Sequence, residues 1–356
     1  MGLSRSAVYF SNMNSVVAPA PILSDEDALR LHVLLAGEVH AVRIDESAMV
    51  LHALTPKGEA RLPLHASGRA DAYLTQVREL LGGHALGSPG GYPVHLRRWT
   101  RMGQAGAKNL EALLKLGEPE AVLAVAYAPG LTDELARRAW WALPTMEVAR
   151  VMLIHPEVRE GEMGKVLADF LVEHLPFEED AVTAMNTVRI VLGAGRLDAE
   201  ERLALWRKGQ RRPHYLIGFI EHLPDDLPTE GVASIDTPEP VAADAWSRQW
   251  ARCCSGPGQA WLRAVELALE KPPAHEAVYL LLQLIGSYFA PVAVQIAPTT
   301  TSIPADAAAA MADLARLRAE DAEPVLTRTT AVGPLMRKKL DPLLAPVLQN
   351  LRKLRQ

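Results

Sequence analysis

The sequence is poor in cysteine and in aromatic residues. Of its 356 residues only two are cysteines, the adjacent pair Cys253 and Cys254, and aromatic residues make up 5%. Two neighbouring cysteines cannot supply the disulfide framework of a small secreted protein, so we expect a reducing compartment. Alanine and leucine, which lose least on entering a helix, recur throughout the chain. These observations predict a mainly α protein.

The chain also lacks an excess of positive charge. Its formal net charge is −5, which argues against nucleic acid as the main partner because counterion release needs clustered cations. The 49% of hydrophobic and 22% of charged residues are typical of a globular protein and exclude disorder for most of the chain. Residues 1–22 lack the sustained apolar run of a secretory signal, and we expect them to form a flexible tail.

One uncharged stretch, 277–297, is long enough in principle to cross a bilayer. It contains Gln283 and the helix-breaking Pro291. These residues favour a buried helix followed by an extended segment over a membrane span. We therefore expect no integral membrane insertion.

Motifs of known chemistry are absent from the sequence. There is no G-x-x-x-x-G-K-[ST] phosphate loop, no G-x-S-x-G elbow and no H-E-x-x-H zinc motif. The histidines show no spacing typical of metal ligands. We therefore expect no cofactor and no metal site, and a binding protein is favoured over an enzyme.

The first predicted helix, over 24–36, begins with Ser24 as an N-cap and has Leu29, Val33 and Leu34 on one face. Three strands and a second helix are predicted after it, at 39–44, 48–54, 59–65 and 71–81, with the turn Thr55-Pro56-Lys57-Gly58 between the last two strands and Gly82-Gly83 ending the helix. These elements predict a small α+β module.

Helix signals follow one another through the rest of the chain. Thr132 is a predicted N-cap, Pro144 a stop, and Asp198 with Glu201 a capping box for a helix that closes at Gly209. Short helices joined by short loops stack as antiparallel hairpins, which predicts an irregular HEAT-like α-solenoid. The predicted organisation is a flexible tail (1–22), the α+β module (23–91), a helical array (92–223), a proline-rich linker (224–242) and a second helical block (243–356).

A glycine- and arginine-rich segment is the first candidate binding site. No acid occurs between Leu80 and Leu110. Exposed backbone N–H groups at glycines and the forked donors of arginines can together hold a carboxylate, a phosphate or an oxidised sulfur anion. The alternative is an inter-domain hinge whose arginines pair with acids elsewhere, such as those in 157–181. The candidate anion- or partner-binding residues are Gly90, Gly91, Arg97, Arg98, Trp99 and Arg101.

The cysteine pair is the second candidate site. Arg248 and Arg252 lie close to Cys253 and Cys254 in the sequence, and a neighbouring cation can lower a thiol pKa enough for nucleophilic or persulfide chemistry. The alternative is a pair of packing residues near the end of a helix.

The last residues, 337–355, form a basic amphipathic pattern with leucines at helical spacing. Such a helix can dock on a partner or an anionic surface. The alternative is a helix that caps the array and keeps its cations in solvent.

Four segments of the sequence, 86–103, 116–122, 129–141 and 223–228, resemble the sulfur reduction protein DsrS family. The resemblance covers about 23–341 and consists of shared segments without a chemical motif. It implies a soluble cytoplasmic protein that is encoded beside the reverse-acting dissimilatory sulfite reductase and its sulfur-trafficking partners in bacteria that oxidise stored sulfur. It brings no catalytic residue to this sequence.

These observations lead to one functional expectation and two alternatives. We expect a non-enzymatic accessory protein of cytoplasmic dissimilatory sulfur oxidation that binds a protein partner through its helical array. The first alternative is a sulfur carrier or thiol enzyme that uses Cys253 or Cys254. The second is an anion-sensing protein that uses the glycine- and arginine-rich segment.

Overall fold

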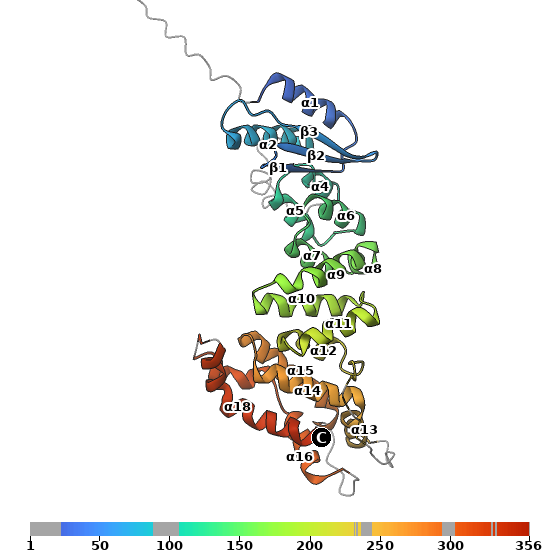
Figure 1. The fold of residues 1–356 in the computed structure, drawn as a ribbon, viewed down its shortest axis with the longest axis vertical. Helices are drawn as coiled ribbons and strands as arrows, with labels where there is room; N and C mark the ends of the chain where they lie inside the picture. Colours follow the sequence, from blue (N-terminus) through green and yellow to red (C-terminus); the bar gives the residue numbers. More distant parts are fainter. Residues whose placement is uncertain are drawn as a thin grey trace, which may run out of the picture. The chain divides into compact units, whose positions relative to one another are not determined.

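The computed structural model describes residues 23–87, 107–230, 244–293, 303–328 and 333–355, together with five single positions between them (232, 234, 235, 330 and 331). The chain forms two compact units, 1–125 and 126–356. The mainly helical fold with one small sheet agrees with the predicted fold class (Figure 1).

The first unit contains a three-stranded antiparallel sheet in the order β1-β2-β3. Asp45 lies opposite Val50 in one pair of strands, and Thr55 lies opposite Gly58 in the other, so the predicted turn joins β2 and β3. The elements are α1 (Asp25–Ala36), β1 (Ala41–Asp45), β2 (Val50–Thr55), β3 (Gly58–Pro63), α2 (Ala70–Leu86), α4 (Ala107–Leu113) and α5 (Pro119–Ala126).

Helix α1 buries a different face from the predicted one. Leu29 is 64% exposed and Val33 is 68% exposed, while Leu31 and Leu35 belong to the core. The reason is Asp27, one and two helical turns before those leucines, which is buried and hydrogen-bonded to residues outside its own helix. A buried carboxylate must keep such partners, so Asp27 turns the helix toward them.

Helix α2 continues through the glycine pair at which it was predicted to end. It runs to Leu86 and stops at Gly87, whose φ of +66° is the left-handed conformation typical of a glycine C-cap. Glycine inside a helix costs about 1 kcal/mol relative to alanine. Burial of Leu81 and Gly82 in the unit core offsets that cost.

The second unit is a stack of short helices, and the predicted caps open two of them. The Thr132 hydroxyl accepts a hydrogen bond from the Leu135 N–H at 3.3 Å, and Asp198 and Glu201 form a reciprocal capping box. Figure 1 shows α9, α10, α11 and α12 following one another through the stack. The elements up to the proline-rich segment are α6 (Asp133–Ala142), α7 (Met146–Leu153), α8 (Pro156–Glu160), α9 (Glu162–His174), η1 (Leu175–Phe177), α10 (Ala181–Ala194), α11 (Ala199–Gly209), η2 (Pro213–Tyr215) and α12 (Leu216–His222).

The helices after the proline-rich segment 224–242 belong to the same compact unit as those before it. Helix α12 packs against both α14 and α15. The division into compact units therefore does not coincide with the segments predicted from the sequence. The remaining elements are α13 (Ala245–Cys254), α14 (Gly256–Glu270), α15 (His275–Ala293), α16 (Ala305–Leu314), η3 (Ala319–Ala322), α17 (Glu323–Leu326) and α18 (Gly333–Leu354).

Helix α15 is the one described helix that is long and apolar enough to cross a membrane by length and composition. It packs against α13, α14 and α16, and Leu281, Leu282, Ile285 and Phe289 are among its fully buried residues. Such burial is typical of the core helix of a helical array.

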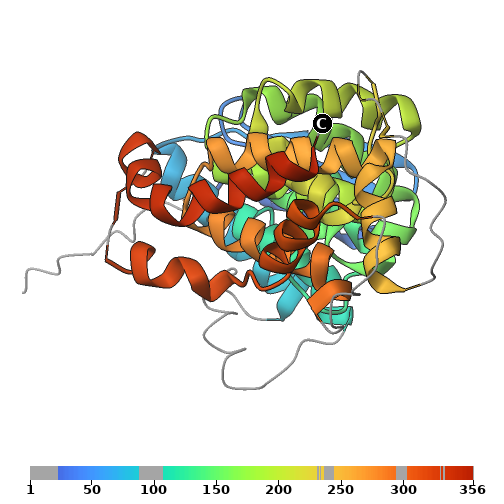
Figure 2. The ribbon, with the colours of Figure 1, turned by 90° about the horizontal axis from the view of Figure 1, so that it is seen from below.

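The basic C-terminal helix α18 packs on α14 and α16, and Figure 2 shows it in red beside orange helices of the same unit. Its leucines 340, 344 and 351 are buried. Arg352 bonds Glu266 of α14 at 2.5 Å. These contacts agree with the capping interpretation.

Candidate functional site

The glycine- and arginine-rich candidate site lies outside the described residues, and this includes Gly90, Gly91, Arg97, Arg98, Trp99 and Arg101. Anion binding at this segment therefore stays a prediction. Two of the acids in 157–181 that were considered as its counter-charges have cationic partners inside the second unit. Glu178 pairs with Arg150 at 3.4 Å, and Asp169 pairs with Lys165.

The two cysteines lie in the interior of the second unit, at the end of α13. Cys253 is 0% exposed and Cys254 is 1% exposed. Burial raises the pKa of the Cys253 thiol to about 12 and that of Cys254 to about 11. The neighbouring Arg252 is held by the Asp225 carboxylate at 2.6 Å and 2.8 Å. Both thiols are therefore neutral near pH 7, which argues against a nucleophilic or persulfide role.

The described structure brings together a different set of side chains, at the end of α11. Leu205 and Trp206 are buried, and the Trp206 ring packs edge-to-face on Phe219 of α12 at a centroid distance of 5.2 Å. These contacts fix the inward face of α11. Arg207 and Lys208, the next two residues, therefore lie on its outer face and are exposed.

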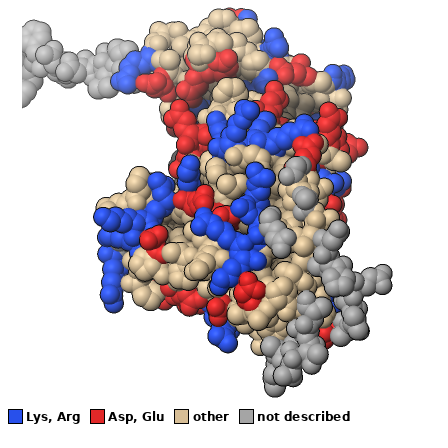
Figure 3. All heavy atoms as spheres, turned by 60° about the horizontal axis from the view of Figure 1, so that its bottom comes forward, with Lys and Arg blue, Asp and Glu red and all other residues tan. Residues whose placement is uncertain are grey.

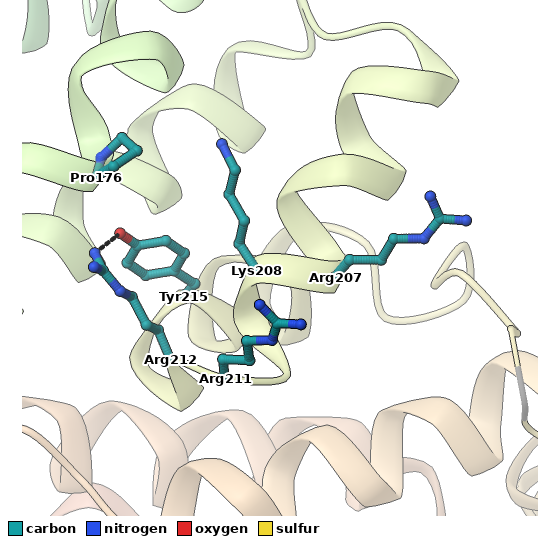
Figure 4. Close-up of a pocket in the computed structure, with 6 residues that line it drawn as sticks. All are labelled: Pro176, Arg207, Lys208, Arg211, Arg212 and Tyr215. Atoms are coloured by element: carbon teal, nitrogen blue, oxygen red, sulfur yellow. Dashed lines mark hydrogen bonds between the residues drawn. The ribbon is translucent and has the colours of Figure 1, made fainter.

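The turn after α11 adds two more cations to the same place. Arg211 and Arg212 lie between α11 and η2, and their backbone N–H groups both bond to the Lys208 carbonyl oxygen at 3.1 Å. Together with Pro176 and Tyr215, the four cations line a pocket of about 460 Å³, which we call the basic pocket (Figure 4).

Tyr215 fixes one wall of the basic pocket. Its hydroxyl donates to the Leu175 carbonyl oxygen at 3.3 Å and accepts a hydrogen bond from Arg212 at 2.9 Å. The Arg212 guanidinium also lies 5.8 Å from the centre of the Tyr215 ring. In Figure 4, Arg212 and Lys208 lie on either side of this ring, and Arg207 extends away from Pro176. Arg212 is thus held in place by a neutral partner and keeps its charge for a ligand.

The cations of the basic pocket differ in whether a carboxylate neutralises their charge. Arg207 forms a two-pronged ion pair with Glu230, at 2.6 Å and 2.9 Å. Its hydrogen bonds hold the pKa of Glu230 below the usual range, so Glu230 is ionised near pH 7. Within the described part of the chain, the side chains of Lys208 and Arg211 form no ion pair or hydrogen bond. Among the described residues, the pocket therefore has an excess of positive charge that no carboxylate neutralises.

A helix end accounts for only part of this charge. Arg207 and Lys208 lie in the last turn of α11, where cations offset the negative end of the helix dipole. Arg211 and Arg212 lie beyond the helix, so this effect does not explain them. On the face shown in Figure 3, lysines and arginines gather in clusters with acids between them.

No protein-family model, curated protein or solved structure matches the chain.

The basic pocket suits an anionic ligand bound by side-chain donors. Guanidinium groups bind carboxylates through paired hydrogen bonds, and the ammonium of Lys208 adds a point charge. Among the described residues, no group of three or more His, Cys, Asp or Glu side chains is placed to hold a metal ion.

Sequence reasoning missed the basic pocket, although a signal for it exists. Between residues 202 and 220 the sequence has five cations and no acid. The same criterion, an acid-free stretch rich in arginine, selected the segment around Arg97. Two of these cations, Arg207 and Lys208, coincide with the end of the helix predicted to close at Gly209, where basic residues are common.

Proposed function

We propose that the protein is a non-enzymatic adaptor that binds a protein partner through its helical array. Stacked helical repeats present extended surfaces that are suited to binding other chains. The observation that carries the proposal is the basic pocket, because Lys208 and Arg211 are exposed cations without a carboxylate partner in the described residues. In a chain of net charge −5, such a local surplus favours an acidic surface on the partner.

The proposed setting is cytoplasmic dissimilatory sulfur oxidation. Its support is the resemblance of four sequence segments to the DsrS family, one of which, 223–228, directly follows α12. The partner is then a protein of the sulfur-oxidation machinery.

The alternative of a persulfide carrier needs an accessible thiolate. Cys253 and Cys254 are both buried, and burial raises both pKa values. The site geometry therefore favours the adaptor over the carrier.

Affinity purification of the tagged full chain from sulfur-oxidising cells tests the adaptor. The double variant Lys208→Ala/Arg211→Ala removes two charges from the pocket without removing any side-chain hydrogen bond or ion pair of the described structure. Arg328→Ala/Lys338→Ala removes two exposed charges outside the pocket and serves as the matched control.

We expect one defined protein to co-purify with the unchanged chain and with the control, and to be lost or strongly reduced with the pocket variant. Equal recovery with both double variants would show that the partner does not use this pocket. Recovery of no protein, together with turnover of a substrate by the purified chain, would contradict the adaptor.

A further inference from the structure

The outer face of α11 already holds acids from the chain's own loop after α12. Asp226 bonds Arg202 at 3.0 Å, and Glu230 bonds Arg207 through both carboxylate oxygens. Between the two acids, Leu227 is only 4% exposed. Two arginines of α11 therefore bind a segment in which acids flank a buried leucine. This segment shows that α11 can bind an acidic peptide chain.

Only one of these two ion pairs belongs to the basic pocket. Arg207 lines it together with Lys208 and Arg211, whereas Arg202 does not. Glu230 is exposed and so is Arg207. An ion pair between exposed groups is weak and exchanges readily with a competing carboxylate.

The donors of the pocket distinguish between classes of anion. The backbone N–H groups of Arg211 and Arg212 are already bonded to the Lys208 carbonyl oxygen, so they are not free to form the backbone cradle typical of phosphate sites. Tyr215 is 1% exposed and cannot stack on a base, as single-stranded nucleic acids require. Cationic side chains around an open pocket suit a row of carboxylates.

We propose that the basic pocket binds an acidic peptide segment of the partner, and that Glu230 competes with that segment for Arg207. This rests on the proposed adaptor function and names the chemistry of its partner. The peptide's carboxylates bind Lys208, Arg211 and Arg212, and one of them replaces Glu230 on Arg207. Glu230 thereby lowers the affinity of the pocket for weakly acidic segments.

Glu230→Gln and Asp226→Asn form a matched pair of variants for the test. Each removes one negative charge from the same loop at nearly constant size, and each breaks one ion pair to α11. Only Glu230→Gln frees an arginine of the pocket. Binding of a fluorescent peptide of alternating Glu and Leu to the full chain is measured by anisotropy, with a Gln-for-Glu peptide, inorganic phosphate and a single-stranded oligonucleotide as competitors.

We expect Glu230→Gln to tighten binding of the Glu peptide roughly threefold, the scale of one surface ion pair, and Asp226→Asn to leave it unchanged. Lys208→Ala/Arg211→Ala weakens binding roughly tenfold or more because two charge-assisted contacts are lost, and the Gln peptide does not compete. Thermal unfolding confirms that each variant is folded.

Equal tightening by both loop variants would overturn the role of Glu230, because it would be a general effect of net charge. Stronger binding of phosphate or of the oligonucleotide than of the Glu peptide would overturn the acidic-peptide assignment. Either result leaves the adaptor function standing if a partner co-purifies through another surface of the array, so the two proposals fail separately.

Discussion

The indole Nε1 of Trp261 donates a hydrogen bond to the carbonyl oxygen of Ile220 at 3.3 Å, although 41 positions separate the two residues. The Trp261 ring also stacks on Tyr288, with ring centres 3.8 Å apart. One side chain of α14 thus contacts both α12, which precedes the proline-rich segment, and α15, which follows it. The helices on the two sides of this segment share one core.

Replacing Trp261 is therefore expected to destabilise both halves of the second unit at once. Trp261→Ala lowers the free energy of unfolding by about 3 to 5 kcal/mol, as other large buried aromatic truncations do. Urea unfolding measures the change. Phe177→Ala is the control, because Phe177 is 79% exposed and its loss is worth about 0.5 kcal/mol or less. Two separate unfolding transitions within the second unit, 126–356, of the unchanged chain would contradict the shared core.

The sequence predicted those features that depend on neighbouring residues. Thr132 and Asp198 begin their helices as expected, because a capping side chain bonds backbone groups only three positions away. The turn between β2 and β3 follows from Pro56 and Gly58 for the same reason.

The features that the sequence did not predict correctly depend on contacts between residues far apart in the chain. The inward face of α1 is set by Asp27, whose partners are 38 and 46 positions away. The basic pocket needs Pro176 to lie beside Arg212, and no local pattern indicates that pairing. The sequence also did not decide whether the cysteines are buried. The nearby Arg248 and Arg252 suggested a reactive thiol, but burial among distant residues sets the thiol pKa.

Gly286 in α15 provides a test of close packing between elements. A Cβ added there would lie 2.0 Å from the Leu317 carbonyl oxygen, so backbone must move. Gly286→Ala is expected to lower the free energy of unfolding by about 1 to 3 kcal/mol, the usual cost of overpacking.

The matched control for Gly286 is Gly83, which also lies inside a helix but has open space around its Cβ position. Gly83→Ala is expected to stabilise the protein by about 0.5 to 1 kcal/mol through helix propensity. Thermal unfolding of the two variants should therefore shift in opposite directions. A shift of the same sign for both would contradict the close approach at Leu317.

Asp27 provides a test of the first unit. Burial by itself raises the pKa of this carboxyl, but hydrogen bonds from Tyr73 and His65 outweigh burial, and the net pKa is lowered. A carboxyl whose folded pKa is below its unfolded value stabilises the fold above the unfolded pKa, here 3.8, and loses that contribution as the pH falls through the folded value.

Asp27→Asn is expected to lower the free energy of unfolding by roughly 2 kcal/mol near pH 7, because bonds to a charged acceptor are replaced by weaker ones. The difference from the unchanged chain should shrink below pH 3.8. Asp25→Asn, at an exposed position of the same first turn, serves as the control with a small effect. Urea unfolding at several pH values measures both, and a pH-independent difference would count against the charged network.

The buried cysteines predict both a chemical and a pH-dependent behaviour. In the unfolded chain a thiol has its ordinary pKa of 9.0, whereas burial raises the pKa to about 12 for Cys253 and about 11 for Cys254. Above pH 9.0 the unfolded chain therefore releases protons that the folded chain keeps. The stabilisation from the two neutral thiols is complete below the unfolded pKa and is lost as the pH rises toward the folded values.

Alkylation with iodoacetamide followed by mass spectrometry tests this behaviour. The native protein is expected to react very slowly near pH 8, and the urea-unfolded chain to gain a label on both thiols, because only the thiolate attacks and both sulfurs are enclosed. In Cys253→Ala/Cys254→Ala the decrease of stability above pH 9.0 should be shallower than in the unchanged chain. Rapid labelling of the native protein would show that the thiols are accessible, and it would restore the persulfide carrier as the better interpretation.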